Sequence, residues 1–229
     1  MALQVGLELA KAWRDLRERD PELLHGPSLV RHRGYAPAMA LTLVYETHAT
    51  TTDNEAGIAT GWLPGVLSDQ GRVQAAELGA RRRDDGIDAV YVSDLARALE
   101  TVRIAFEAST IPVRVDPRLR ECDYGSLNGM PRERLDAERT THIHEPWPGG
   151  ESYDEVVERT RALLTDIGAR HEGGRVLVVA HSANRLALDV LLLGHDLATL
   201  LAEPFDWRPG WEYEIATGTG GDVGSEAEA

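Results

Sequence analysis

The chain has little cysteine, a deficit of basic residues and no long hydrophobic run. Cys122 is the only cysteine in 229 residues, so no disulfide can form within the chain, which fits a reducing compartment. Lysine and arginine number 24 against 38 aspartate and glutamate, and the net charge of −14 argues against nucleic-acid or anionic-membrane partners. No apolar stretch approaches the ~20 residues that cross a bilayer, and residues 1–20 lack a signal-peptide core. We therefore expect a cytoplasmic protein that binds neither nucleic acid nor membrane.

Length and residue pattern predict one main domain with an extension at each end. Apolar residues near helical spacing between 4 and 24, followed by a Gly- and Pro-containing stretch, predict a partly helical N-terminal extension over residues 1–38. The main domain is expected over residues 39–217. Residues 218–229 are rich in Gly and acids and lack core residues, so we expect them to be disordered.

Strand-like and helix-like segments alternate along the main domain. The predicted strands are 41–45, 87–93, 111–115, 175–180 and 211–215. The predicted helices are 68–83, 94–108, 152–171 and 183–194, the first of them capped by Ser68. This alternation predicts an α/β fold in which a mostly parallel sheet lies between two layers of helices, a three-layer α/β/α sandwich.

Two of the predicted strands run directly into a histidine. His48 follows the strand at 41–45 within the segment ETHATTTDN, and His181 follows the strand at 175–180. Parallel strands end at the same edge of a sheet, and that edge is where open α/β sheets bind ligands. We therefore expect the two histidines to form a pair, in which one attacks a substrate and the other stabilises the charge that develops.

Two further segments supply an arginine and a glutamate. Arg97 lies in SDLARALET and Glu121 in LRECDYGSLNG. Phosphoryl transfer needs a nucleophile, cationic donors for the equatorial oxygens and an acid for the leaving group. Histidine can carry a phosphoryl group without a metal, and arginine suits phosphate because it donates two parallel hydrogen bonds.

The order of these motifs resembles the histidine phosphatase superfamily, which includes cofactor-dependent phosphoglycerate mutases. The family's opening strand and R-H-G-x-T motif are matched by residues 47–51, its L-[ST]-x-x-G-x-x-Q-A pattern by residues 67–75, and its S-x-L-x-R-A-x-x-T pattern by residues 93–101. The acid-bearing loop matches 119–129, a substrate-side loop matches PGGES at 148–152, and the second-histidine strand matches 175–183. The resemblance spans residues 39–217 and implies a phosphoglycerate mutase-like fold.

The resemblance also implies roles for individual residues. His48 would attack phosphorus and become phosphohistidine, Arg97 and His181 would bind the phosphoryl oxygens, and Glu121 would act as general acid and base. Hydrogen bonds to substrate are expected from four residues: Thr47, Thr51, Asn54 and Ser182. For Thr51, Asn54 and Ser182 a role as a turn or cap residue remains an equal alternative. We expect a small phosphorylated substrate, no metal and no cofactor, and we leave a homodimer open.

The opening motif departs from the family pattern at the first arginine. Thr47 stands in its place, with Glu46 beside it, and Ala49 and Ser182 replace the glycines that follow the two histidines. A hydrogen bond to a charged group contributes ~1.5–3 kcal/mol, so the change could weaken phosphoryl binding by roughly tenfold to a few hundredfold. Either the site is weakened, or another cation compensates, or the substrate is unusual.

Several other patterns offer alternatives. LVRHRG at 29–34 resembles the missing motif, but no convincing strand precedes it; we reject it as the nucleophile and keep only the hypothesis that Arg31 or Arg33 covers the pocket. HIHE at 142–145 could hold zinc but lacks further ligands. Ser182 could sit in a hydrolase elbow, but Asp189 and His195 lie too close together to complete its triad. Trp147, Trp207 and Trp211 are expected to pack in the core rather than stack on substrate.

These observations predict a phosphatase that hydrolyses a small phosphomonoester through phosphohistidine on His48. Hydrolysis is favoured over mutase activity because the stretch between Glu121 and His181 is short. A phosphatase-like binding or regulatory protein, impaired by loss of the arginine, is the main alternative.

Overall fold

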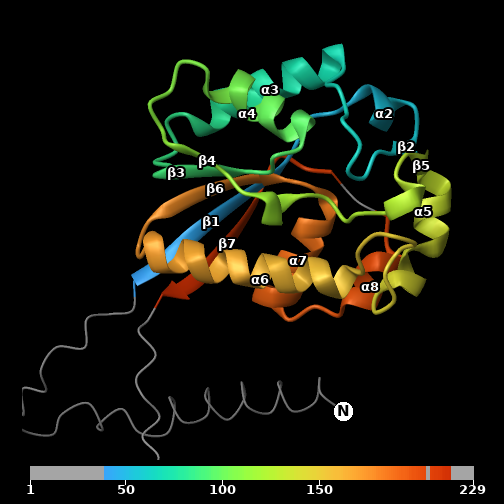
Figure 1. The fold of residues 1–229 in the computed structure, drawn as a ribbon. Helices are drawn as coiled ribbons and strands as arrows, with labels where there is room; N and C mark the ends of the chain where they lie inside the picture. Colours follow the sequence, from blue (N-terminus) through green and yellow to red (C-terminus); the bar gives the residue numbers. More distant parts are fainter. Residues whose placement is uncertain (1–38, 205–206, 218–229) are drawn as a thin grey trace, which may run out of the picture. The chain divides into compact units, whose positions relative to one another are not determined.

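A five-stranded sheet lies at the centre of the part of the chain that the structure describes, residues 39–204 and 207–217 of a computed structural model (Figure 1). Its strands are β1 (Met39–Thr47), β3 (Ala89–Val92), β4 (Val113–Val115), β6 (Arg175–Ala180) and β7 (Trp211–Thr217). They are ordered β4-β3-β6-β1-β7, and only β7 at one edge runs antiparallel to its neighbour. The prediction of a mostly parallel sheet is confirmed.

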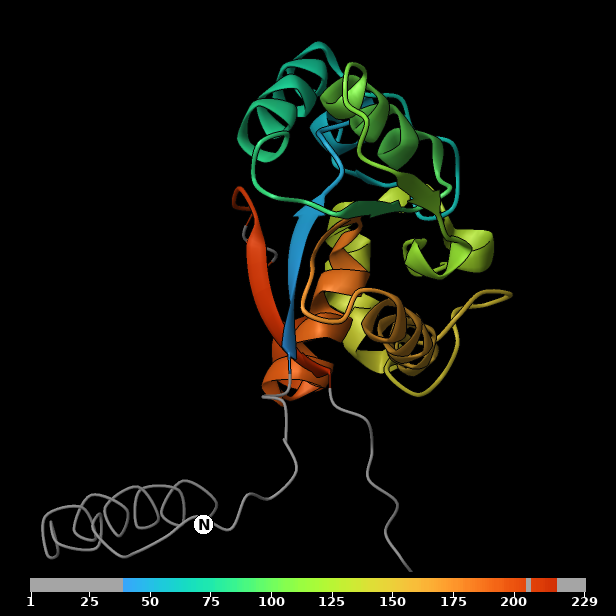
Figure 2. The ribbon, with the colours of Figure 1, turned by 90° about the vertical axis from the view of Figure 1, so that its left-hand side faces the viewer.

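Helices cover both faces of this sheet, which confirms the three-layer sandwich. The helices α3 (Asp69–Arg82) and α4 (Ala96–Phe106) lie over one face, and α6 (Tyr153–Arg170) and α7 (Ser182–Leu193) lie over the other (Figures 1 and 2). Two of these helices, α3 and α6, begin at a serine cap: the Ser68 side chain accepts from the Gly71 N–H, and Ser152 forms a capping box with Glu155.

Strict alternation along β1 divides its side chains between the two layers. Leu41, Leu43 and Tyr45 belong to the core cluster beneath α6 and α7. Val44 belongs to the cluster beneath α3 and α4. Since successive side chains of a strand point to opposite faces, Glu46 is directed to the α3 side and Thr47 to the other. This parity separates the carboxylate of Glu46 from the hydroxyl of Thr47.

The short elements were not predicted from the sequence. They are α2 (Thr52–Glu55), β2 (Ile58–Ala59), β5 (Met130–Pro131), α5 (Arg132–Glu138) and α8 (Leu197–Ala202). The strands β2 and β5 pair with each other in a separate two-stranded sheet. Segments of two to seven residues are too short to show a helical or strand period, so pattern analysis misses them.

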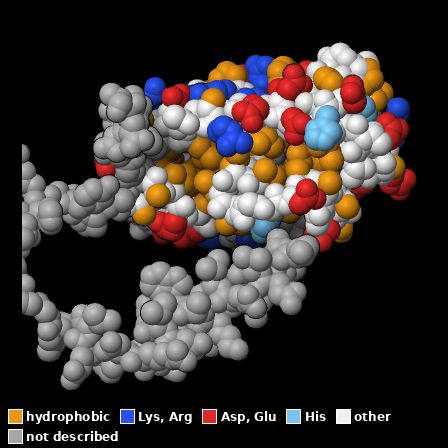
Figure 3. Space-filling view, turned by 90° about the horizontal axis from the view of Figure 1, so that it is seen from below, with side chains coloured by type: hydrophobic (Ala, Val, Ile, Leu, Met, Phe, Trp, Pro, Cys, Tyr) orange, Lys and Arg blue, Asp and Glu red, His pale blue; other side chains and the backbone are white. Residues whose placement is uncertain are grey.

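The expected extension at 1–38 and tail at 218–229 lie outside the described residues. On the outer face of α6 and α7, hydrophobic side chains reach the surface among charged ones (Figure 3). Leu164, Leu191 and Leu192 line a groove there.

Candidate active site

The register between β1 and β6 brings the two histidines together. Thr47 pairs with Ala180 at the carboxyl ends of these parallel strands, and the backbone N–H of His48 donates to the Ala180 carbonyl at 2.9 Å. His48 and His181 therefore leave the sheet side by side, with their ring centroids 5.0 Å apart. The predicted pairing of the histidines is seen in the structure.

The His48 ring is held in one tautomer. Its Nδ1 lies 2.8 Å from the Ala49 carbonyl, which can only accept, so the ring proton is on Nδ1. Its Nε2 accepts from the Nε of Arg97 at 3.2 Å and therefore carries a lone pair. Burial, and secondly the positive charge of Arg97, lower the pKa of His48 to about 3. His48 is thus a neutral imidazole whose Nε2 can attack.

Arg97 lies at the centre of the site and is almost fully buried, with 2% of its surface exposed. Besides His48, it donates to the carbonyls of Gly61 at 2.8 Å and Leu63 at 3.2 Å. Burial lowers the pKa of Arg97, against the opposing effect of the Glu121 carboxylate. The guanidinium is fixed in orientation before any ligand arrives, as electrostatic catalysis requires.

His181 lies behind this arginine. The Nη2 of Arg97 is 3.3 Å from the Nδ1 of His181, so the neutral ring carries its proton on Nε2. Burial, followed by the charge of Arg97, lowers the pKa of His181 well below its ordinary value. Among the described residues, the buried Nε2 has no hydrogen-bond partner. The Nε2–H of His181 is therefore an unpaired donor close to Arg97.

Glu121 is held from below by the start of α7. Its Oε1 accepts from the backbone N–H groups of Cys122 at 2.8 Å and Ala183 at 3.2 Å, and its Oε2 accepts from the Ser182 hydroxyl at 2.9 Å. Ser182, which replaces a glycine of the resembled motif, therefore positions the predicted acid. A glycine could not make this contact.

A cavity of about 260 Å³ opens over these groups, and we call it the catalytic cavity. Polar and charged residues of the lining include Thr47, His48, Asn54, Arg97, Glu121, Arg132 and Ser182. Thr51 and His181 are fully buried and do not line it. Of the eight predicted site residues, the structure thus brings six to one cavity and places His181 directly behind it.

Thr51 and Asn54 form a capping box at the start of α2. The Thr51 hydroxyl accepts from the Asn54 N–H, and the Asn54 side-chain oxygen accepts from the Thr51 N–H, both at 3.0 Å. Thr51 thereby takes the alternative role as a cap, whereas Asn54 both caps and faces the catalytic cavity.

The carboxylate of Glu46, next to the position of the missing arginine, points away from the site. Glu46 is 2% exposed and accepts from Arg82 Nε at 2.9 Å, with Arg81 at 3.3 Å, on the α3 side of the sheet. Thr47 lines the catalytic cavity, and its hydroxyl is buried and has no hydrogen-bond partner in the described part of the chain. Glu46 is therefore neutralised away from the position where phosphate would bind.

A family model of the histidine phosphatase superfamily, branch 1, matches residues 47–206. The chain belongs to the histidine phosphatase superfamily. A probable phosphoglycerate mutase GpmB from Erwinia tasmaniensis is 34% identical over 158 residues, which cover 63% of this chain and 70% of that protein. Phosphoserine phosphatase 1 from Hydrogenobacter thermophilus is 30% identical over 164 residues, covering 68% and 78%.

Solved structures of histidine phosphatases share the fold. A mycobacterial glucosyl-3-phosphoglycerate phosphatase superposes with a TM-score of 0.63 at 30% identity, over 71% of this chain and 84% of that one. The family and these relatives together indicate an enzyme of the phosphatase type.

The histidine phosphatase pattern at residues 67–75 has a packing explanation. A Cβ on Gly71 would lie 1.9 Å from the Thr50 carbonyl oxygen, so only glycine lets α3 approach the His48 loop this closely. Gln74 then accepts from the Thr50 N–H at 2.9 Å, and Thr101 accepts from the Ala49 N–H at 3.0 Å. The motif residues hold the backbone after the nucleophile.

PGGES at 148–152 was expected on the substrate side, but none of its residues lines the catalytic cavity. Glu151 instead accepts from the Asp123 N–H at 3.1 Å and pairs with Arg159 at 3.0 Å. Arg159 also donates to the Glu121 carbonyl at 3.0 Å. In this histidine phosphatase the loop supports the acid-bearing segment from behind.

Sequence reasoning missed four residues of the site. Trp62 donates from Nε1 to the Glu121 carbonyl at 2.7 Å, and Asn128 accepts from the Trp62 N–H at 3.2 Å, so the loop that accepts from Arg97 is tied to the Glu121 segment. Arg132 and Trp207 line the catalytic cavity. Trp207 is 49% exposed, so its expected core packing is wrong, whereas Trp147 and Trp211 are buried as expected. No periodic pattern marks loop residues that meet only in three dimensions.

The structure also bears on the alternative motifs, which are a zinc site at HIHE and a hydrolase triad with Asp189. His142 stacks on Trp147 and His144 pairs with Asp154, and no group of three or more potential metal ligands occurs among the described residues. Asp189 is engaged by Arg185 and Tyr213, not by a histidine side chain of a triad. Arg31 and Arg33 lie outside the described residues. No helix in the described part of the chain is long and apolar enough to cross a membrane.

Proposed function

We propose that the protein is a phosphatase that hydrolyses a small-molecule phosphomonoester through a phosphohistidine at His48. The observation that carries the proposal is the Nε2 lone pair of a neutral His48, fixed by the Ala49 carbonyl and facing Arg97 inside the catalytic cavity. The relatives that are named as phosphatases support it.

In the first step, Nε2 of His48 forms a bond to phosphorus while the bond to the ester oxygen breaks. Arg97 keeps its place on the Gly61 and Leu63 carbonyls, and the N–H groups that face the two imidazoles donate to the phosphoryl oxygens instead. We propose the Nε2–H of His181, which has no partner in the described residues, as a further donor. The departing oxygen takes a proton from Glu121. The imidazole gains positive charge, which its Nδ1–H shares with the Ala49 carbonyl at 2.8 Å.

In the second step, water attacks phosphorus and the bond to Nε2 breaks. Glu121, now ionised, accepts the proton that the water loses, so His48 returns to its neutral form and inorganic phosphate is released. The Ser182 hydroxyl and two backbone N–H groups hold Glu121 for both transfers. No metal is needed at any step, and a chelator should leave the rate unchanged.

Arg132 is the cation that we propose to compensate for the arginine missing at Thr47. It begins α5 and lines the catalytic cavity. Its side chain is 41% exposed, and within the described residues it donates from Nε to Asp136 on the same helix, which leaves the Nη groups for an anion. The Thr47 hydroxyl supplies a neutral donor.

The test is turnover of 4-nitrophenyl phosphate. His48→Ala should lower kcat/KM at least about a thousandfold, because it removes the nucleophile. His144→Ala is the matched control, because His144 is an exposed histidine outside the cavity, and it should retain the wild-type rate. Equal rates for His48→Ala and the wild type would overturn the proposal and favour a binding or regulatory protein on this fold.

A further inference from the structure

A second cavity of about 210 Å³ is lined by three arginines. We call it the arginine cavity. Its lining includes Arg139, Arg185, Arg208, Ser182, Glu203 and Trp211. Ser182 lines both this cavity and the catalytic cavity, so both spaces border the residue that holds Glu121.

The charge of this lining contrasts with that of the whole chain. Three arginines and one acidic residue, Glu203, line the cavity, in a protein whose net charge is −14. Arg139 and Arg185 also pair with Asp136 and Asp189, whereas Arg208 has no ion pair among the described residues. Clusters of one sign in a concave site attract ligands of the opposite sign. Guanidinium groups suit carboxylates and phosphates in particular, because each offers parallel donors.

Two of the three arginines are held firmly. Arg139 is 6% exposed, donates to the Glu203 carbonyl at 2.7 Å and pairs with Asp136 at 3.3 Å. Arg185 pairs with Asp189 at 2.6 Å and lies over the Trp211 ring, 5.4 Å from its centroid. A fixed guanidinium loses little freedom when it binds an anion.

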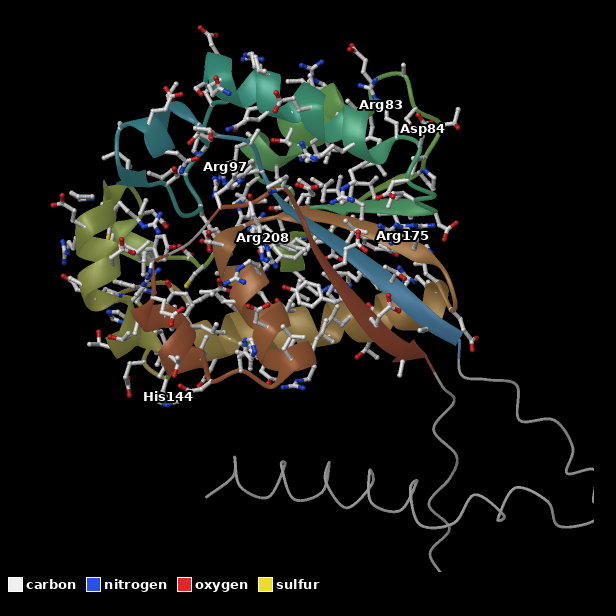
Figure 4. The ribbon with its side chains drawn as sticks, turned by 180° about the vertical axis from the view of Figure 1, so that it is seen from behind. Arg83, Asp84, Arg97, His144, Arg175 and Arg208 are labelled. Carbon is white, nitrogen blue, oxygen red and sulfur yellow. The ribbon has the colours of Figure 1, made fainter. Side chains whose placement is uncertain are left out.

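Arg208 is the third arginine and the most accessible. Its guanidinium lies 5.1 Å from the Trp211 ring centroid, and no ion pair involves it among the residues that the structure describes. Its neighbour Trp207 lines the catalytic cavity, so two consecutive residues line the two different cavities. Figure 4 shows Arg97 and Arg208 near the same end of the sheet.

The segment that carries Arg208 is anchored by the buried Glu46. A Cβ on Gly210 would lie 2.2 Å from Arg82 Nη2 and 3.1 Å from Glu46 Oε1, and Gly210 has a φ of +87°. Only glycine suits both the conformation and the close approach. The Glu46–Arg82 pair thereby holds the backbone at Gly210, two residues after Arg208.

The geometry points to the arginine cavity as a second anion-binding subsite, so that the substrate is a phosphomonoester with a second anionic group, a carboxylate or a phosphate. The assignment of the first subsite rests on the proposed function. The reacting phosphoryl group would lie at His48 and Arg97, and the second anion would pass Ser182 to reach Arg208.

Binding calorimetry on the wild-type protein tests this without turnover. The probes are α,ω-alkane bisphosphonates of increasing chain length, with monophosphonates of matching length for comparison. We expect at least one bisphosphonate to bind about tenfold or more tightly than its matched monophosphonate, because a charged hydrogen bond contributes that much. The ω-carboxyalkyl phosphonates show whether carboxylate or phosphate is preferred.

Arg208→Ala should abolish the preference for the second anion, while Arg103→Ala, a change at another exposed arginine, should keep it. A series with no preferred bisphosphonate, or a preference that survives Arg208→Ala, would overturn the inference. Because binding is measured, it can hold even if His48→Ala leaves turnover unchanged, and it can fail while the phosphatase proposal stands.

Discussion

At the scale of single residues, the departures from the family pattern acquire physical roles. Glu46 is not a second acid in the site, because strand parity turns it to Arg82. Ser182 replaces a glycine and binds Glu121. Thr47 lines the catalytic cavity, and its buried hydroxyl has no hydrogen-bond partner in the described residues. We propose that a phosphoryl oxygen becomes that partner when substrate binds.

The substitution Thr47→Val should weaken anion binding without lowering the free energy of unfolding. An unpaired buried polar group costs roughly 1–3 kcal/mol, so the free energy of unfolding should stay constant or rise. Affinity for orthovanadate should fall about three- to tenfold, because one neutral hydrogen bond is lost. Urea unfolding and vanadate inhibition measure the two effects.

The matched control is Thr101→Val, which removes a hydroxyl that is bonded to the Ala49 N–H and the Arg97 carbonyl. It should lower stability. If Thr47→Val lowers stability as much as Thr101→Val, then the Thr47 hydroxyl has a partner within the protein and is not reserved for substrate.

At the scale of elements, the ends of the long strands could be predicted, and the connections between them could not. Periodic apolar runs predicted β1, β6 and the long helices, and both strands lead into a histidine at the same edge of the sheet. The pairing of β1 with β6, which sets His48 beside His181, is seen only in the fold. Trp62, Asn128 and Arg132 belong to loops and short elements with no period, so only the folded chain reveals that they join the site.

The helix α3 offers a prediction at this scale. Gly71→Ala and Gly79→Ala should each destabilise the protein by about 1–3 kcal/mol, because each new Cβ overlaps a backbone carbonyl. The overlap is with Thr50 in the first case and with Ala105 in the second. Only the first contact adjoins the His48 loop.

At a temperature where both variants stay folded, Gly71→Ala should lower kcat/KM about tenfold, since small displacements of catalytic groups cost much activity. Gly79→Ala should keep the wild-type value. Equal activity losses would show that α3 acts through global stability, not by positioning the residues after His48.

At the scale of the whole molecule, the two buried histidines of the active site should lower the free energy of unfolding as the pH falls. The folded-state pKa of His48 is lowered to about 3, and that of His181 is also well below its ordinary value. The unfolded chain therefore binds protons at these sites as the pH falls below about 6.5, while the folded chain does not. Stability is lost as the pH falls through that range.

Between pH 7 and pH 5 each histidine should contribute up to about 2 kcal/mol of lost stability. Urea unfolding across this range should show the loss, and His48→Asn should remove roughly half of it. His144→Asn, a change at a histidine outside the active site, is the control. A wild-type stability that does not vary over this range would mean that the histidines titrate normally in the folded state.

The whole chain combines an acidic composition with a cationic active-site region, which composition alone could not reveal. The net charge of −14 did not reveal the three arginines that line one cavity with Ser182. Arg139, Arg185 and Arg208 come from three separate segments, so only the tertiary fold brings them together.

The most direct measurement is to trap the covalent intermediate. Glu121→Gln keeps the nucleophile but lacks the base for the second step, and 4-nitrophenol leaves without help from an acid. After rapid mixing with 4-nitrophenyl phosphate and quenching at alkaline pH, mass spectrometry should find one phosphoryl group on the peptide that contains His48. A protein without this group, or with it on His181 or Ser182, would contradict phosphoryl transfer through His48.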